Sequence, residues 1–130
     1  MSAMKELTRA EEEVMQILWN LGRAFVKDIV EQFSEPRPAY NTVSTIVRIL
    51  ERKGVVSHKA YGNTHEYYPL VARDEYKKTY VKSFVRRYFG GSFTDMVSFF
   101  AGERDLSVEE LEEMQNRLSE EIQAQKGGGK

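Results

Sequence analysis

The sequence predicts a mostly α-helical protein with one small β-hairpin. Three observations predict this fold class: helical periodicity along most of the chain, one stretch of strand character near residues 55–68, and a second helical half rich in aromatic residues. Three helices followed by a hairpin, within the first 71 residues, is the order of a winged helix-turn-helix domain. We therefore expect a winged-helix DNA-binding domain at 1–71, a helical dimerisation region at 72–125 and a flexible tail at 126–130.

The first three helices are predicted from caps, apolar spacing and breaks. Thr8 and Glu11 form a capping box, in which each side chain binds the amide of the other residue, so a helix is expected over 8–21. A shorter helix is expected over 26–34, because Pro36 and Pro38 disfavour helix at the residues before them. A third is expected over 41–53, where apolar residues follow i, i+3, i+4, i+7 spacing up to Gly54.

The hairpin is predicted by two runs of strand character around a turn. The first run covers residues 55–61 and the second covers 64–68. Gly62 and Asn63 lie between them and are typical turn residues, and Pro69 closes the second strand. The first domain therefore ends in a hairpin of the kind that forms a wing.

The second half of the chain is expected to form helices over 73–89, 92–101 and 108–125. Three amphipathic helices of this length do not fill a core by themselves, and their aromatic content is too high for a solvated surface. We expect this half to pair with a second copy of the chain in a homodimer, with packing onto the chain's own first domain as the alternative. The residues expected at the dimer interface are Tyr80, Phe84, Tyr88, Phe93, Met96, Phe100, Leu111, Met114 and Leu118.

The composition excludes several classes of site. The chain has no cysteine, which excludes disulfides, thiolate metal sites and cysteine nucleophiles, and it has two histidines, His58 and His65. Neither a glycine-rich phosphate loop nor a Ser/His/Asp arrangement is present, so we expect no enzyme, no metal and no cofactor. The absence of a long apolar run and of a leader-like N-terminus predicts a cytoplasmic protein without membrane insertion.

The distribution of charge is more informative than the net charge of −1. Between residues 37 and 65 the acidic residue is Glu51, and the basic residues are Arg37, Arg48, Arg52, Lys53 and Lys59. Because screening limits the reach of charge to roughly 8–10 Å, a polyanion responds to this local excess rather than to the total. An ordinary solvated helix face is the alternative explanation.

The outward face of the third predicted helix carries side chains that suit a DNA major groove. That groove accepts a helix whose outward side chains bind base edges, and a neighbouring hairpin reaches the backbone. The residues expected to face bases are Asn41, Thr42, Ser44 and Thr45. The residues expected to face phosphates are Arg48, Arg52, Lys59 and His65. The sequence thus predicts double-stranded DNA as a partner.

Five stretches of the sequence, in the same order, resemble the penicillinase and methicillin-resistance repressor family (BlaI/MecI/CopY type). They resemble the opening helix, the recognition helix, the end of the wing and two parts of the dimerisation half of that family, over about residues 7–120. The stretches are Thr8-x-Ala10-Glu11-x-x-Val14-Met15-x-x-Leu18-Trp19, Asn41-Thr42-Val43-x-Thr45-x-x-x-x-Leu50-x-x-Lys53-Gly54, Tyr67-Tyr68-x-Leu70, Gly90-Gly91-Ser92-Phe93 and Asp105-Leu106-Ser107-x-x-Glu110-Leu111.

The resemblance implies a homodimeric winged-helix repressor that binds dyad-symmetric operators ahead of antibiotic-resistance or stress genes. For the β-lactam branch of the family it also implies a membrane sensor-protease as a partner, and cleavage in the dimerisation half at a position that corresponds here to Phe99-Phe100. This chain departs from staphylococcal members at that pair, where they have Asn-Phe, and at Ser44, where they have arginine. Without cysteine it cannot be the copper sensor of the family.

Two other functions remain open at the level of sequence. The modest basicity and the acidic last helix are also compatible with a winged-helix protein-interaction module that binds no DNA. Alternatively, the chain could be a repressor that is induced by a small ligand, bound among the aromatic residues of the fourth and fifth predicted helices.

Overall fold

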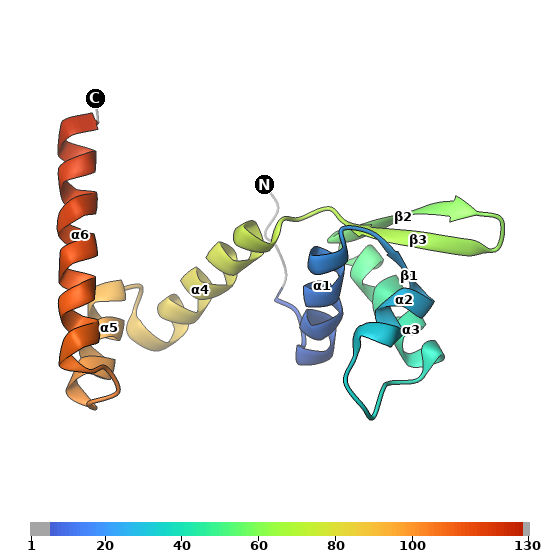
Figure 1. Cartoon of the computed structure of the whole chain (residues 1–130), viewed down its shortest axis with the longest axis horizontal. Coiled ribbons are helices and arrows are strands. Elements are labelled where there is room, and N and C mark those ends of the chain that lie inside the picture. Colours follow the sequence, from blue (N-terminus) through green and yellow to red (C-terminus); the bar gives the residue numbers. More distant parts are fainter. Residues whose placement is uncertain (1–5, 129–130) are drawn as a thin grey trace. The chain divides into compact units, whose positions relative to one another are not determined.

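The computed structural model describes residues 6–128 and confirms the predicted fold class, mostly α-helical with a small antiparallel sheet (Figure 1). In chain order the elements are α1 (Arg9–Leu21), β1 (Ala24–Phe25), α2 (Val26–Gln32), α3 (Tyr40–Arg52), β2 (Val56–Tyr61), β3 (Thr64–Pro69), α4 (Arg73–Phe89), α5 (Phe93–Gly102) and α6 (Val108–Gly128). The chain divides into two compact units at Val81 and Lys82, so the first turns of α4 belong to the first unit. The boundary expected from the sequence lies earlier, between residues 71 and 72.

The hairpin of β2 and β3 carries a third, short strand that the sequence did not predict. The strand order is β1-β3-β2, with Ala24 opposite Tyr67 and Phe25 opposite Glu66. Gly62, in the turn between β2 and β3, has a φ of 63°, which glycine adopts without steric cost. The hairpin projects from the helices of this unit as a wing (Figure 1).

The core of the first unit lies where the apolar faces of α1, α2 and α3 meet the sheet. Each apolar residue there is at least nine-tenths buried. Full burial of a Val, Leu, Ile or Met side chain contributes about 1.5–3 kcal/mol to the stability of the fold. The core residues are Leu7, Val14, Met15, Leu18, Ala24, Val26, Ile29, Val43, Val47, Leu50, Val55, Val56, Tyr67 and Tyr76. This packing fixes α3 with one side buried and the opposite side outward.

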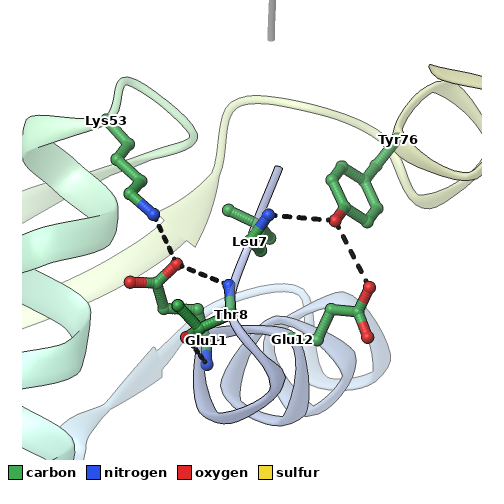
Figure 2. Close-up of polar contacts among 6 residues, drawn as sticks. All are labelled: Leu7, Thr8, Glu11, Glu12, Lys53 and Tyr76. Carbon is green, nitrogen blue, oxygen red and sulfur yellow. Dashed lines mark hydrogen bonds and ion pairs between the residues drawn. The ribbon is translucent and has the colours of Figure 1, made fainter. Parts of the chain in front are cut away.

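The predicted capping box at the start of α1 is present and is tied to the end of α3 (Figure 2). The Thr8 amide donates to Glu11 Oε1 at 3.0 Å, and the Glu11 amide donates to Thr8 Oγ1 at 3.2 Å. Lys53 Nζ also donates to Glu11 Oε1, at 2.6 Å. Burial raises the pKa of Glu11, but the bonds from Lys53 and Thr8 outweigh it and hold that pKa below 4.5. Glu11 is therefore a buried carboxylate that stays ionised.

Tyr76 fastens the beginning of α4 to the N-terminal segment (Figure 2). Its hydroxyl accepts a hydrogen bond from the Leu7 amide at 3.2 Å and donates to Glu12 Oε2 at 3.3 Å. Burial raises the pKa of Tyr76 to about 12, against the opposing effect of the Leu7 amide. Beside it, Trp19 Nε1 donates to the Val71 carbonyl at 2.7 Å. These contacts explain why the first unit extends into α4.

The second unit leaves most of its large apolar side chains in contact with solvent. Among its described residues, 82–128, the buried apolar side chain is Val85. Val108 and Leu118 are more than 60% exposed. The last helix reaches Gly128 instead of ending at 125, so the expected tail is helical as far as it is described. Residues 129–130 of that tail lie outside the described part of the chain.

Candidate nucleic-acid interface

The outward face of α3 is polar, basic and exposed, as the sequence predicts. Val43, Val47 and Leu50 are fully buried on the inner side of the helix. The predicted site residues on the outer side are Asn41, Thr45, Arg48 and Arg52, which are exposed, and Ser44, which is half-buried. The 100° step of an α-helix separates the two sets, because positions three or four apart share a face.

Arg48 reaches back toward the N-terminal half of α3. Its Nη1 lies 3.3 Å from Ser44 Oγ and its Nη2 lies 3.5 Å from Thr45 Oγ1. These bonds are long for a guanidinium and therefore weak, so little energy is needed to turn Arg48 toward an anion. The three side chains form one continuous polar surface on the helix.

A hollow of about 180 Å³ lies between α3 and the tip of the wing and brings three predicted site residues together. Ser44 and Arg48 line it from α3, and His65 lines it from β3. The other lining residues are Val26, Tyr40, Asn63, Thr64 and Tyr67. Burial, reinforced by the Glu51 carboxylate, raises the pKa of the Tyr67 phenol, so this phenol stays protonated near neutral pH.

Five of the residues that line the hollow were missing from the predicted site, and three of them, Tyr40, Asn63 and Thr64, are exposed. Tyr40 lies four residues before Ser44 on α3, one position before the predicted start of that helix. Asn63 and Thr64 follow the turn glycine of the wing. Sequence reasoning could have found Tyr40 from its i, i+4 spacing to Ser44 once the helix began at residue 40.

The predicted residues that do not line the hollow are Asn41, Thr42, Thr45, Arg52 and Lys59, and two of these lie on other surfaces. Thr42 lines a different cavity, of about 660 Å³, together with residues of α1 and of the segment between α2 and α3. Lys59 is opposite Glu66 in the hairpin, whereas His65 is opposite Ala60, so Lys59 and His65 point to opposite faces of the sheet. Lys59 Nζ lies 5.3 Å from the centre of the Tyr61 ring.

The residues predicted for the dimer interface are divided between the two units. Tyr80 belongs to the first unit, where its ring stacks on Tyr76 with the ring centres 6.0 Å apart. Exposed or half-buried members of the set in the second unit are Phe84, Tyr88, Phe93, Met96, Phe100, Leu111, Met114 and Leu118. Phe99 and Phe100 lie inside α5, and Phe99 is exposed.

The described residues offer no alternative chemistry for a site. Over 6–128, no three His, Cys, Asp or Glu side chains gather in a way that could hold a metal ion. None of the helices in that part of the chain combines the length and apolarity needed to cross a bilayer.

Comparisons with known proteins identify the family. The sequence profile of the penicillinase repressor family matches residues 7–120. The methicillin resistance regulatory protein MecI of Mammaliicoccus sciuri is 32% identical over 115 residues, 88% of this chain and 94% of that protein. The penicillinase repressor of Bacillus licheniformis is 26% identical over 121 residues, 92% and 94% of the two chains.

A solved structure is similar to a little over half of this chain. The solution structure of the DNA binding domain of the repressor BlaI matches with a TM-score of 0.50 and 23% identity, covering 58% of this chain and 94% of that one. This likeness supports the winged-helix fold. With a family profile that spans most of the chain, the conclusion from the sequence resemblance is confirmed: this chain belongs to the penicillinase repressor family.

Proposed function

We propose that this chain is a transcriptional repressor that binds double-stranded DNA by placing α3 in the major groove and the wing along the backbone. The observation that carries the proposal is the hollow where Ser44 and Arg48 of α3 meet His65 of the wing. A major groove about 12 Å wide accepts a helix with such outward side chains. A member of a repressor family is a regulator and not an enzyme, as the sequence predicts.

The residues divide by the part of DNA that they would contact. Asn41, Ser44 and Thr45 are short and polar and lie near the start of α3, where they suit base edges. Arg48 and Arg52 follow one and two turns later and suit phosphates. His65 is proposed as a phosphate contact from the wing. We keep Thr42, which is exposed near the start of α3, as a proposed base contact, and Lys59, on the opposite face of the wing from His65, as a proposed phosphate contact.

We further propose that the repressor is a homodimer on a dyad-symmetric operator. The exposed apolar faces of α5 and α6 support this, because a patch such as Val97, Val108, Leu111 and Leu118 is costly in water and is removed when two copies pair. Two linked domains bind two half-sites far more tightly than one domain binds one. A protein that stays monomeric at micromolar concentration would contradict this part of the proposal.

The inducing step is proposed from the family and not from geometry. Relatives are named methicillin resistance regulatory protein and penicillinase repressor, which supports control of antibiotic-resistance genes by this chain too. A cut by a membrane sensor-protease between Phe99 and Phe100 would break α5 within the proposed dimer surface. The site is helical, so cleavage there requires α5 to open locally first, because a helical backbone does not fit an extended binding cleft.

The experiment that tests DNA binding is a salt titration with matched variants. Fluorescence anisotropy would follow binding to the DNA upstream of the protein's own gene, in the presence of competitor DNA. Arg48→Ala should weaken binding to all sequences and lower the slope of log K against log salt by about 0.9, the value for one lost phosphate contact. Arg117→Ala is the control, because it removes the same charge from α6, where Arg117 pairs with Glu113.

The outcomes separate the proposal from its main alternative. An unchanged slope for Arg48→Ala would remove Arg48 from the interface but leave the repressor function standing. No binding by the unmodified protein at moderate salt would favour the protein-interaction module, in which the basic face of α3 is only a solvated surface.

A further inference from the structure

A chain of three side chains joins α3 to the wing, and one of them, His65, lines the hollow between these elements. Glu51 lies on α3, one turn after Arg48. His58 lies on β2, and His65 lies on β3. His58 Nδ1 is 2.8 Å from Glu51 Oε2 and 3.0 Å from Oε1. On its other side, the His58 ring lies 4.0 Å from the His65 ring, with 9° between the planes.

The chemistry of this chain fixes the orientation of His58. A carboxylate only accepts hydrogen bonds, so Nδ1 of His58 carries the proton that it donates to Glu51. The pair is two-thirds covered, with His58 29% and Glu51 32% exposed in their side chains, so water competes only partly for the bond. A ring held on one edge by a two-pronged acceptor cannot rotate freely about its χ2 angle.

The fixed ring of His58 in turn restricts His65. His65 is exposed and has solvent on one side, so without a neighbour its side chain would sample several rotamers. Parallel stacking against His58, with Tyr67 at 6.2 Å on the edge, favours one of them. That rotamer lines the same hollow as Ser44 and Arg48. An ordered side chain loses less entropy on binding than a mobile one.

We propose that His58 is a positioning residue for DNA binding: held by Glu51 of the recognition helix, it orients His65 of the wing toward the DNA. His58 itself makes no contact with DNA. The inference rests on the proposed function. It also explains why α3, the helix proposed to face DNA, carries the acidic Glu51. Glu51 fixes the orientation of the His58 ring, and through that ring the orientation of His65.

The test is a double-mutant cycle on DNA affinity, with His58→Ala, His65→Ala and the double variant. If His58 acts through His65, His58→Ala should weaken binding by about threefold to tenfold, the range that one ordinary hydrogen bond supplies. In the His65→Ala background the same change should have no further effect. Multiplying effects in the double variant would overturn the proposal. His58→Phe, which keeps a flat ring beside His65 but loses the bond to Glu51, should fall between His58→Ala and the unmodified protein.

A control variant and a second readout keep the test independent of folding. Lys59→Ala changes the neighbouring residue on the opposite face of the hairpin, so its effect should multiply with that of His65→Ala instead of being absorbed by it. In NMR spectra without DNA, the His65 ring protons should lose the upfield shift caused by the stacked ring in His58→Ala and keep it in Lys59→Ala. Unmoved His65 signals would overturn the proposal, whether or not the protein binds DNA. Failure of the unmodified protein to bind DNA would instead overturn the proposed function.

Discussion

Replacing Lys53 with methionine should destabilise the first unit, and the loss should depend on pH. The change leaves Glu11 as a buried carboxylate without its cation, because Lys53 Nζ lies 2.6 Å from Glu11 Oε1 and the two side chains are 23% and 8% exposed. Removing one partner of a fully buried pair costs roughly 3–5 kcal/mol. Because Lys53 retains some contact with water and Thr8 still donates to Glu11, we expect about 2 kcal/mol at neutral pH.

The pH dependence follows from the direction of the pKa shift. In the unmodified protein the pKa of Glu11 is held below 4.5, so its ionised form stabilises the fold above that pH and the stabilisation is lost as pH falls through the folded pKa. Without Lys53 the effect of burial dominates and the folded pKa rises. The difference in unfolding free energy between the two proteins should therefore be greatest near neutral pH and shrink toward about pH 4.

Urea denaturation followed by tryptophan fluorescence measures this difference, because Trp19 is the one tryptophan of the chain and lies in the first unit. Lys77→Met is the matched control: its side chain is 67% exposed and pairs with Asp74 at 3.4 Å, so its loss should cost less than about 0.5 kcal/mol. If the difference in unfolding free energy between Lys53→Met and the unmodified protein stays constant between about pH 7 and about pH 4, the reasoning is refuted. Such a result would show that the loss of Lys53 does not change the pKa of Glu11.

Three further predictions follow from other contacts. Tyr76→Phe should lower the unfolding free energy by about 1–2 kcal/mol, because it leaves the Leu7 amide without its acceptor. Since the pKa of Tyr76 is about 12, the unmodified protein should also lose stability from about pH 10 to about pH 12. In urea titrations over that pH range the variant should lose less. Leu50→Ala should cost about 2–5 kcal/mol in the same denaturation assay, and a smaller loss would mean that the core collapses around the cavity. Thr45→Ala should change the preference among half-sites more than the overall affinity, as competition binding would measure; a uniform loss would make Thr45 a positioning contact.

Local signals predicted most of the fold. The capping box of Thr8 and Glu11 depends on residues three apart, and it is present as expected. By contrast, β1 is two residues long, too short for any periodicity, and exists only because Ala24 and Phe25 pair with β3. The end of α6 also differs, because glycines usually stop helices but do not forbid them.

The candidate site shows the same division between local and long-range information. The exposed face of α3 followed from helical spacing alone. The separation of Lys59 from His65 could not be read from charge, because it depends on the register that the Gly62 turn imposes on the two strands. The contact between Glu51 and His58 joins residues seven apart on different elements, so no sequence pattern indicates it.

The attachment of the opening turns of α4 to α1 determines where this protein can be divided. A fragment that ends at residue 71 would lack Tyr76, so the Leu7 amide would lose its acceptor and one face of Trp19 would open to water. A fragment that ends at residue 81 keeps both contacts. It should therefore give better-dispersed NMR signals and a higher melting temperature than the fragment that ends at residue 71. The smallest stable DNA-binding fragment of this repressor is thus expected to be longer than its winged helix.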